Sequence, residues 1–338
     1  MKKKILVLAT SFLDDLVSHP KEEGKAKKML EDLESKFGNK IEVEYRCDRN
    51  PEKKLTVEEL KNVVAVIADL EIYDRKLLSK VGKKAGGSLE LIARYGIGYV
   101  SVDLEAATEF GVMVTNAPGC NALPTAEWTH ATIMAVAGRR INHYYTASKG
   151  KVKEGPSRLD VTNKKLGIIG TGTIGKNVAK LMSGYEVEIL AYDIYPDNNW
   201  AKKNNAKYVK LEELYKESDI ITIHAAASEQ LIGAKEISMM KKTTILVNCA
   251  RGILTDNRAI YNAVKENKLW GFGLDEIWTE EDLPLDESLN IIVSSHVGSD
   301  TDSGKIGMQV MSTEAVVDFI SGKRPKHVVN KEIFNKDN

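Results

Sequence analysis

Short apolar runs rich in β-branched residues alternate along the chain with stretches in which charged and apolar residues recur at helical spacing. In the first third, this pattern predicts strands at 3–9, 41–47, 64–69, 89–93 and 112–116. Helical segments are predicted between them, for example at 56–62 and 103–110. Alternation of this kind is typical of βαβ units, in which a helix connects two parallel strands. A small doubly wound α/β domain is therefore expected here.

The later part of the chain repeats the pattern after an interruption. A long apolar-rich helix is predicted at 125–148, and the polar segment that follows it, 149–163, is predicted to be a loop. A second series of strands is predicted at 165–169, 186–192, 220–225, 244–249, 270–274 and 290–295, and a last helix at 301–321. The pattern alone therefore predicts two doubly wound parallel-sheet domains.

The charge balance narrows the function classes. The 338 residues include 48 Lys plus Arg and 48 Asp plus Glu, so the formal net charge is zero. Proteins that bind nucleic acid present a basic patch or stripe, so a neutral balance argues against that partner and against an anionic membrane surface. With 43% hydrophobic and 28% charged residues, the composition is that of an ordinary globular protein.

The start of the chain and its cysteines indicate a cytoplasmic protein. The lysines at 2–4 precede an apolar run of about five residues, shorter than the roughly 7–15 of a signal peptide. No apolar stretch reaches the roughly 18 residues of a membrane-spanning helix. Cys47, Cys120 and Cys249 are far apart, which argues against a disulfide framework and fits a reducing compartment. No set of residues shows metal-ligand spacing, so no metal site is predicted.

A glycine-rich motif carries the clearest chemistry. Gly170, Gly172 and Gly175 form a GxGxxG string that follows a predicted strand and opens a predicted helix. In dinucleotide-binding units, the first glycine permits a tight turn, the second lets the backbone approach a pyrophosphate, and the third lets the helix pack on the strand. Asp193 ends the next strand, where its carboxylate can accept a hydrogen bond from a ribose hydroxyl. It would repel a 2′-phosphate, so NAD is favoured over NADP.

Further polar residues lie at or near the ends of the second series of strands: His224, Arg251, Asp275 and His296. In doubly wound sheets, ligands bind outside the carboxyl ends of the strands, so these side chains are expected to line one site. Arg251 suits a carboxylate or a keto oxygen, and His296 is the natural proton donor near neutral pH. Glu280 and Glu281 are both available as its carboxylate partner, and the sequence leaves that choice open.

Several longer strings follow one another in a fixed order: 94–99 (RYGIGY), 111–119 (GVMVTNAPG), 126–127 (AE), 246–252 (LVNCARG) and 295–298 (SHVG). Together with the glycine motif, they resemble the D-isomer-specific 2-hydroxyacid dehydrogenases, which include phosphoglycerate dehydrogenase and glyoxylate/hydroxypyruvate reductase. The resemblance extends over about residues 89–330. It implies an NAD-dependent oxidoreductase that interconverts a 2-oxo acid and the D-2-hydroxy acid by hydride transfer.

The resemblance also implies roles for individual residues. The implied cofactor-binding residues are Gly170, Gly172, Thr173, Ile174, Gly175, Asp193, His224, Cys249, Ala250 and Asp275. The implied substrate-binding residues are Arg94, Ile97 and Gly98. The implied catalytic residues are Arg251, Glu280 and His296. In this scheme Arg251 binds the substrate, Asp275 lies near the nicotinamide ring, and His296 is the acid or base, paired with Glu280.

The domain order of the family revises the tandem arrangement. It implies a flavodoxin-like substrate-binding domain at 1–118 plus 300–338, and an NAD-binding Rossmann domain at 119–299 inserted into it. The helix predicted at 125–148 corresponds to the dimer arm of the family, so a homodimer is expected.

The chain departs from the family pattern near the predicted site. The segment after His224 is shorter than usual, Glu276-Ile277 replaces the usual Val-Phe pair, and Ser295 replaces the proline before His296. An alternative function is a non-catalytic NAD(H)-sensing regulator of the C-terminal-binding-protein type, which shares the fold and keeps similar residues. Turnover of a 2-oxo acid distinguishes the two, because a regulator would bind NADH without turnover.

Overall fold

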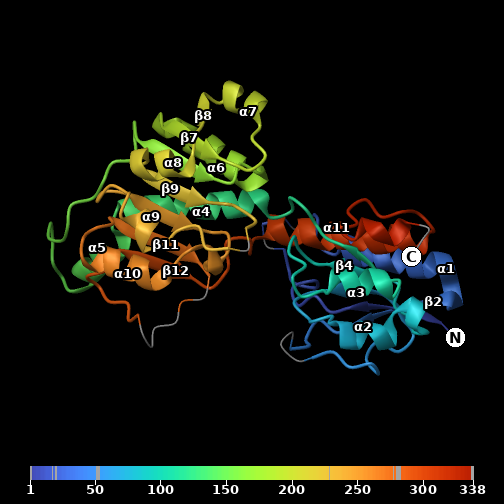
Figure 1. The fold of residues 1–338 in the computed structure, drawn as a ribbon. Coiled ribbons are helices and arrows are strands. Elements are labelled where there is room, and N and C mark those ends of the chain that lie inside the picture. Colours follow the sequence, from blue (N-terminus) through green and yellow to red (C-terminus); the bar gives the residue numbers. More distant parts are fainter. Residues whose placement is uncertain are drawn as a thin grey trace. The chain divides into compact units, whose positions relative to one another are not determined.

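The computed structural model describes residues 2–16, 18–19, 21–50, 54–227, 229–276, 278 and 283–335. The chain divides into two compact units (Figure 1). The first unit comprises Met1–Asn121 and Thr301–Asn338, and the second comprises Ala122–Asp300. The second unit is therefore an insertion into the first, which the end of the chain completes.

The first unit is built on a sheet of five parallel strands in the order β2-β1-β3-β4-β5. The strands are β1 (Lys3–Val7), β2 (Ile41–Tyr45), β3 (Val63–Ala68), β4 (Leu91–Arg94) and β5 (Met113–Thr115). This is the strand order of flavodoxin-like sheets. All six residues of β3, VVAVIA, are buried. A continuous apolar strand of this kind is expected where helices cover both faces of a parallel sheet.

Two pairs of helices provide that cover. One face packs against α1 (Lys25–Phe37) and α11 (Asp302–Ile320), whose Leu30 and Val316 share a core with Ile5 of β1. The other face packs against α2 (Arg75–Val81) and α3 (Leu104–Glu109). Short 3-10 turns are η1 (Gly38–Lys40), η2 (Lys83–Ala85) and η5 (Lys331–Phe334).

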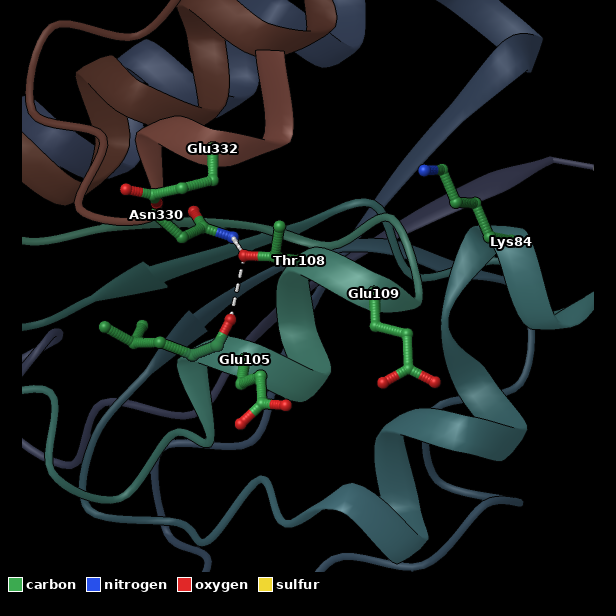
Figure 2. Close-up of a pocket in the computed structure, with 7 residues that line it drawn as sticks. Lys84, Glu105, Thr108, Glu109, Asn330 and Glu332 are labelled. Atoms are coloured by element: carbon green, nitrogen blue, oxygen red, sulfur yellow. Dashed lines mark hydrogen bonds between the residues drawn. The ribbon is translucent and has the colours of Figure 1, made fainter. Parts of the chain in front are cut away.

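The end of the chain returns to β5, where a buried asparagine contacts both β5 and α3. Asn330 donates hydrogen bonds to Thr108 Oγ1 (3.1 Å) and to the Val112 carbonyl (2.9 Å), and its Oδ1 accepts one from the Val114 N–H (2.8 Å). Figure 2 shows Asn330 beside α3, in a pocket that also presents Glu105 and other charged side chains. None of the predicted site residues lines this pocket.

The second unit is built on seven parallel strands in the order β12-β11-β10-β9-β6-β7-β8. The strands are β6 (Lys165–Ile169), β7 (Glu188–Tyr192), β8 (Ala206–Tyr208), β9 (Ile220–Ile223), β10 (Ile245–Asn248), β11 (Gly271–Asp275) and β12 (Ile291–Ser294). The chain winds outward from β6 in both directions, as in the Rossmann fold. The two sheets confirm the predicted fold class, a Rossmann domain inserted into a flavodoxin-like domain.

Helices also cover both faces of the second sheet. They are α4 (Ala122–Ala137), α5 (Arg140–Ser148), α6 (Thr173–Met182), α7 (Asn198–Lys203), α8 (Leu211–Glu217), α9 (Ala234–Ile237) and α10 (Asn257–Lys265), with 3-10 turns η3 (Ser183–Tyr185) and η4 (Gly252–Leu254). Ile133 of α4 and Val178 of α6 pack in the core on one face, whereas Leu214 of α8 and Ile260 of α10 pack on the other.

The predicted helix at 125–148 is two helices, α4 and α5, because the backbone breaks at Gly138 and Arg139. Two carbonyls that would continue the helix accept hydrogen bonds from elsewhere. The Val136 carbonyl accepts bonds from Asn290 Nδ2 (2.9 Å) and from the Trp270 indole (3.3 Å), and the Ala137 carbonyl accepts one from a loop N–H. Arg139 adopts a left-handed conformation (φ 46°), which ends the helical path.

One predicted helix is absent from the structure, and one short strand was not predicted. The predicted helix at 56–62 is a series of turns that ends at Asn62, whose φ of 61° is left-handed. Strand β8 was not predicted, because three residues at the edge of a sheet are too few to show an alternating pattern. No helix in the described part of the chain has both the length and the apolar character needed to cross a membrane.

Candidate active site

The structure gives a different explanation for each of the three glycines of the motif. Gly170 has a φ of +93°, and a Cβ there would lie 2.6 Å from the backbone carbonyl carbon of His224. A Cβ on Gly175 would lie 2.2 Å from the Gly170 carbonyl oxygen. Around Gly172, by contrast, a Cβ would meet nothing within 4 Å. The fold itself therefore requires the first and third glycines, whereas the second faces open space.

That open space lies at the N-terminus of α6. Gly172 is the N-cap of this helix and supplies no side-chain cap, and both Gly172 and Thr173 are exposed. The first N–H groups of a helix have no intrahelical partner, and the helix dipole favours negative charge beside them. The backbone at Thr173 and Ile174, in the first turn of α6, therefore fits a pyrophosphate group.

Asp193 follows β7 and is tied to the glycine motif. Its Oδ2 accepts hydrogen bonds from the Thr171 N–H (2.6 Å) and hydroxyl (3.1 Å), and its Oδ1 accepts one from the Tyr195 N–H (2.8 Å). A carboxylate offers about four acceptor positions, so these contacts leave capacity for a further donor. The arrangement fits a ribose hydroxyl beside the motif.

His224 follows β9 and lies against Gly170. Its Nε2 is 2.9 Å from the Thr222 hydroxyl, whereas its buried Nδ1 has no hydrogen-bond partner within the described residues. Burial lowers the pKa of the His224 imidazole to about 3, so the ring is neutral at physiological pH. An unpaired buried nitrogen beside the glycine motif fits contact with a bound cofactor.

A buried asparagine shapes the turn after β10. Asn248 Oδ1 accepts a hydrogen bond from the Ala250 N–H (3.0 Å), and its Nδ2 donates to the Arg251 carbonyl (2.8 Å). Arg251 is exposed, and its Nη1 donates to the Ala250 carbonyl (2.7 Å). Burial raises the pKa of the Cys249 thiol to about 12, so Cys249 presents no thiolate at neutral pH.

Asp275, at the end of β11, holds the turn that carries His296. Its Oδ1 accepts hydrogen bonds from the Ser294 hydroxyl (2.6 Å) and the Val297 N–H (2.9 Å), and its Oδ2 accepts one from the Gly298 N–H (2.7 Å). His296 itself has a left-handed φ of 60°, a conformation that costs energy for a residue with a side chain. The buried carboxylate of Asp275 stabilises this unusual turn.

The residue after Asp275 contacts the imidazole. Glu276 Oε2 lies 3.1 Å from His296 Nδ1, and the two side chains are 23% and 50% exposed, respectively. The predicted pair of Glu280 with His296 lies outside the described residues, as does Glu281. Within those residues, Glu276 is the carboxylate that contacts His296.

Arg94, predicted to bind substrate, belongs to the first unit and is buried. Its Nη1 donates to the Ala68 carbonyl (2.7 Å) and its Nε donates to the Gly98 carbonyl (3.1 Å). Burial lowers the pKa of the Arg94 guanidinium. These contacts join the guanidinium to the end of β3 and to the loop that contains Ile97 and Gly98, so Arg94 helps to fix the backbone of that loop.

Sequence reasoning missed three residues that organise these turns: Asn248, Glu276 and Ser294. Asn248 lies inside the distinctive LVNCARG string, and a buried polar residue at a strand end is a usable signal for a turn-forming contact. Glu276 was noted as a departure from the family pattern, and Ser294 had no signal. No group of three or more His, Cys, Asp or Glu side chains within the described residues is placed to hold a metal ion.

Comparison with known proteins gives the family. A model of the D-isomer specific 2-hydroxyacid dehydrogenase NAD-binding domain matches residues 131–298. Glyoxylate reductase of Korarchaeum cryptofilum is 32% identical to this chain over 318 residues, which cover 87% of this chain and 92% of that protein. This chain belongs to the D-isomer specific 2-hydroxyacid dehydrogenase family.

Solved structures of similar proteins agree with the fold of this dehydrogenase. A glyoxylate reductase from Paecilomyes thermophila has a TM-score of 0.80 at 22% identity, and covers 97% of this chain and 98% of its own. A D-lactate dehydrogenase with NAD+ from Lactobacillus jensenii has a TM-score of 0.73 at 23% identity, and covers 96% and 99%. The family confirms the predictions of an NAD-dependent D-2-hydroxyacid dehydrogenase and of NAD as its cofactor.

Proposed function

We propose that this dehydrogenase interconverts a small 2-oxo acid and the D-2-hydroxy acid, with His296 as acid and base and Arg251 as a substrate ligand. One observation carries the proposal. An exposed imidazole, held by a carboxylate, and an exposed guanidinium follow β12 and β10 at the same edge of the sheet as the glycine motif. Ligands of doubly wound sheets bind at this edge.

The residues divide the chemistry between them. When bound, NADH would supply the hydride for the carbonyl carbon of the substrate. His296 donates a proton to the carbonyl oxygen, and the same imidazole removes it in the reverse direction. The positive charge of Arg251 stabilises the negative charge that develops on that oxygen. Asp193, the α6 N-terminus and His224 bind the cofactor, and Asp275 keeps the His296 turn in place.

The first unit contributes donors for the substrate carboxylate. The N–H groups of Ile97 and Gly98 donate no hydrogen bond to any described residue, whereas both carbonyls accept one, from Asn116 and Arg94 respectively. Carbonyls fixed in this way leave the N–H groups available for an anion. We assign these two N–H groups to the substrate carboxylate, and Arg94 supports their loop.

A homodimer is part of the proposal. Tyr144 and Tyr145 on α5 are 66% and 42% exposed, and Val152 beyond the helix is 81% exposed. Exposed apolar side chains grouped along one segment are typical of a protein interface. Sedimentation at micromolar concentration is expected to show a dimer, and a stable monomer of about 37 kDa would contradict this part.

The activity test follows NADH oxidation with a panel of 2-oxo acids that includes glyoxylate, hydroxypyruvate, pyruvate, phenylpyruvate and phosphohydroxypyruvate. Turnover of at least one is expected, with the D-enantiomer as the product by chiral chromatography. Tight NADH binding without turnover of any would favour the regulator instead. An L-product would contradict the assigned stereochemistry.

A further inference from the structure

A tyrosine on the edge strand β8 lies beside the glycine motif. Tyr208 ends this strand, next to β7 (Figure 1), and pairs in register with Ala191, just before Asp193. Its hydroxyl oxygen is 2.7 Å from Oγ1 of Thr171, and Thr171 in turn donates to Asp193. A single hydroxyl group therefore separates Tyr208 from the carboxylate that we assign to the cofactor ribose.

We propose that Tyr208 is a positioning residue for the cofactor. Its hydroxyl, acting through Thr171, holds the Asp193 carboxylate in the orientation that accepts a hydrogen bond from a ribose hydroxyl. This inference rests on the proposed binding of the cofactor by Asp193. Tyr208 needs no contact with the cofactor in this role.

The hydrogen bonds of this series all run in one direction. The Thr171 hydroxyl carries one hydrogen and donates it to Oδ2 of Asp193 (3.1 Å), because a carboxylate only accepts. The Thr171 oxygen must then accept from the Tyr208 hydroxyl. The Tyr208 oxygen accepts in turn from the Asp197 N–H (3.0 Å). Each donor therefore points toward Asp193, and hydrogen bonds in such a series strengthen one another.

The start of the series is held by the helix that follows β7. Asp197 is the N-cap of α7, and its Oδ1 accepts a hydrogen bond from the Trp200 N–H (3.0 Å). Its Oδ2 accepts one from Lys176 Nζ (2.6 Å), and this contact lowers the pKa of Asp197. The Trp200 indole packs edge-on against the Tyr208 ring, with ring centroids 6.4 Å apart. The position of the phenol is therefore set by groups outside the glycine motif.

Burial makes Thr171 dependent on Tyr208. Thr171 is 4% exposed, so its hydroxyl has little access to water. Without the Tyr208 hydroxyl, the Thr171 oxygen would lose its donor in a buried place, and a buried acceptor without a partner is costly. The Thr171 hydroxyl would then be free to turn away from Asp193.

The contacts of Asp193 leave its free acceptor position on one oxygen. Oδ2 accepts two hydrogen bonds from Thr171, and Oδ1 accepts one from the Tyr195 N–H. Since each carboxylate oxygen offers about two positions, the remaining one is on Oδ1. The series thus keeps an acceptor ready for a ribose hydroxyl and withholds the Thr171 donor from a 2′-phosphate. It should therefore strengthen the preference for NAD(H).

The test compares Tyr208→Phe with Tyr215→Phe. Tyr215, on α8 of the same unit, donates its hydroxyl to the Leu231 carbonyl (3.0 Å), so the control loses a comparable hydrogen bond away from Asp193. We expect Tyr208→Phe to raise Kd and KM for NADH about three- to tenfold, as one lost hydrogen bond implies, with kcat at saturating NADH nearly constant. The values for NADPH should change less, so the preference between the cofactors should narrow. Tyr215→Phe should leave NADH affinity within about twofold.

Variants of Thr171 provide the second measurement. Thr171→Val removes the hydroxyl and retains the shape, whereas Thr171→Ser retains the hydroxyl. We expect Thr171→Val to weaken NADH binding at least as much as Tyr208→Phe, and Thr171→Ser to bind NADH nearly as the unmodified protein does. Tyr208 acts only through the Thr171 hydroxyl, so combining Tyr208→Phe with Thr171→Val should weaken binding no further than Thr171→Val alone. Additive losses would overturn the inference.

Stability measurements identify a merely structural role. Circular dichroism and thermal unfolding establish that each variant is folded. If Tyr208→Phe lowered the thermal midpoint but left NADH affinity and the cofactor preference unchanged, the inference would be overturned.

Asp193→Ala separates this inference from the proposed function. If Asp193→Ala leaves NADH affinity and the cofactor preference unchanged, the proposed role of Asp193 fails, and the inference fails with it. If Asp193→Ala narrows the preference and Tyr208→Phe does not, the proposed function stands and only the role of Tyr208 fails.

Discussion

The carboxyl edges of the two sheets differ in what their loops do with polar side chains. At the seven-stranded edge, Asp193, Asn248 and Asp275 all accept hydrogen bonds from backbone N–H groups of the turns. The five-stranded edge has fewer contacts of this kind: Asp69 accepts a hydrogen bond from the Thr10 N–H, and Glu71 accepts one from the Asp69 N–H. Its exposed side chains include the large apolar ones of Leu13, Leu70, Ile72, Tyr99 and Val100, beside acidic ones such as Asp14 and Asp15.

The two edges suit two different requirements, the positioning of reacting groups and contact with a ligand. Hydride and proton transfer tolerate little error in position, and backbone contacts from buried polar groups fix turns closely. Exposed apolar side chains contribute little to folding, so they are available to contact a ligand. We therefore expect the seven-stranded edge to determine the chemistry and the five-stranded edge to determine which substrate is accepted.

The largest expected effect is that of His296→Ala. It removes the proposed proton donor, so kcat for reduction should fall at least about 100-fold, while NADH affinity changes little. Steady-state kinetics and NADH fluorescence titration measure the two quantities. Leu70→Ala, at the other edge, should change KM and leave kcat nearly constant. A larger fall in kcat for Leu70→Ala than for His296→Ala would reverse the comparison.

The glycine motif sharpens the comparison within the seven-stranded edge. Gly175→Ala places a Cβ against the Gly170 carbonyl and should destabilise the fold by about 1–3 kcal/mol. Gly172→Ala meets open space, so the thermal midpoint should not change, whereas NADH affinity should fall about tenfold or more. Thermal unfolding and NADH titration separate the two effects. A stable Gly175→Ala variant would show that the packing reason is wrong.

Much of the fold follows from the sequence because buried parallel strands are continuous apolar runs. Strands such as 64–69 and 165–169 were predicted within one or two residues of β3 and β6. The break between α4 and α5 was not predicted, because it depends on Asn290 and Trp270, which are distant in sequence. The local sequence does not indicate which carbonyls will accept hydrogen bonds from side chains that are distant in sequence.

The same limit applies to the site. The glycine motif and Asp193 were identified from spacing, because the turn, helix and strand end are adjacent in sequence. The directions of the Arg94 guanidinium and the Asp275 carboxylate could not be predicted, since both bind backbone groups whose positions depend on the folded loops. Spacing places a residue at a strand end, but only tertiary structure determines its contacts.

The choice between NAD(H) and NADP(H) tests the seven-stranded edge further. Asp193 presents a carboxylate beside the glycine motif, so we expect a preference for NAD(H) over NADP(H) of about tenfold or more. Asp193→Ala should narrow that preference, measured as the ratio of kcat/KM for the two cofactors. Equal use of both cofactors by the unmodified enzyme would contradict the role of Asp193.

Substrate choice tests the role of the five-stranded edge. The loops at 8–16, 69–73 and 95–102 contain no Lys or Arg, and they carry acidic residues such as Asp14 and Asp69. A phosphorylated 2-oxo acid should therefore be disfavoured against one with an apolar side chain, by about tenfold or more in kcat/KM. Ile72→Arg should reduce this difference, and a preference of the unmodified enzyme for phosphohydroxypyruvate would contradict the division between the edges.

The smallest effect at neutral pH is a difference in acid sensitivity. Burial lowers the pKa of His224, at the seven-stranded edge, to about 3 from an ordinary value of 6.5. Between these values the unfolded chain binds a proton that the folded ring does not, so the free energy of unfolding should fall as pH decreases below about 6.5. From pH 7 to pH 5 the loss is expected to reach about 2 kcal/mol, and His224→Asn should abolish it, as urea unfolding can measure.

The five-stranded edge should respond in the opposite direction. Burial raises the pKa of Glu71, whose Oε2 accepts a hydrogen bond from the Asp69 N–H (2.8 Å) while its Oε1 has no partner in the described part of the chain. The folded state then holds a proton that the unfolded chain releases above its ordinary pKa of about 4.5. Stability from Glu71 is therefore present at low pH and lost as pH rises through the raised value. Glu71→Gln should remove this loss of stability. If His224 and Glu71 changed the stability in the same direction with pH, the contrast between the two edges would be contradicted.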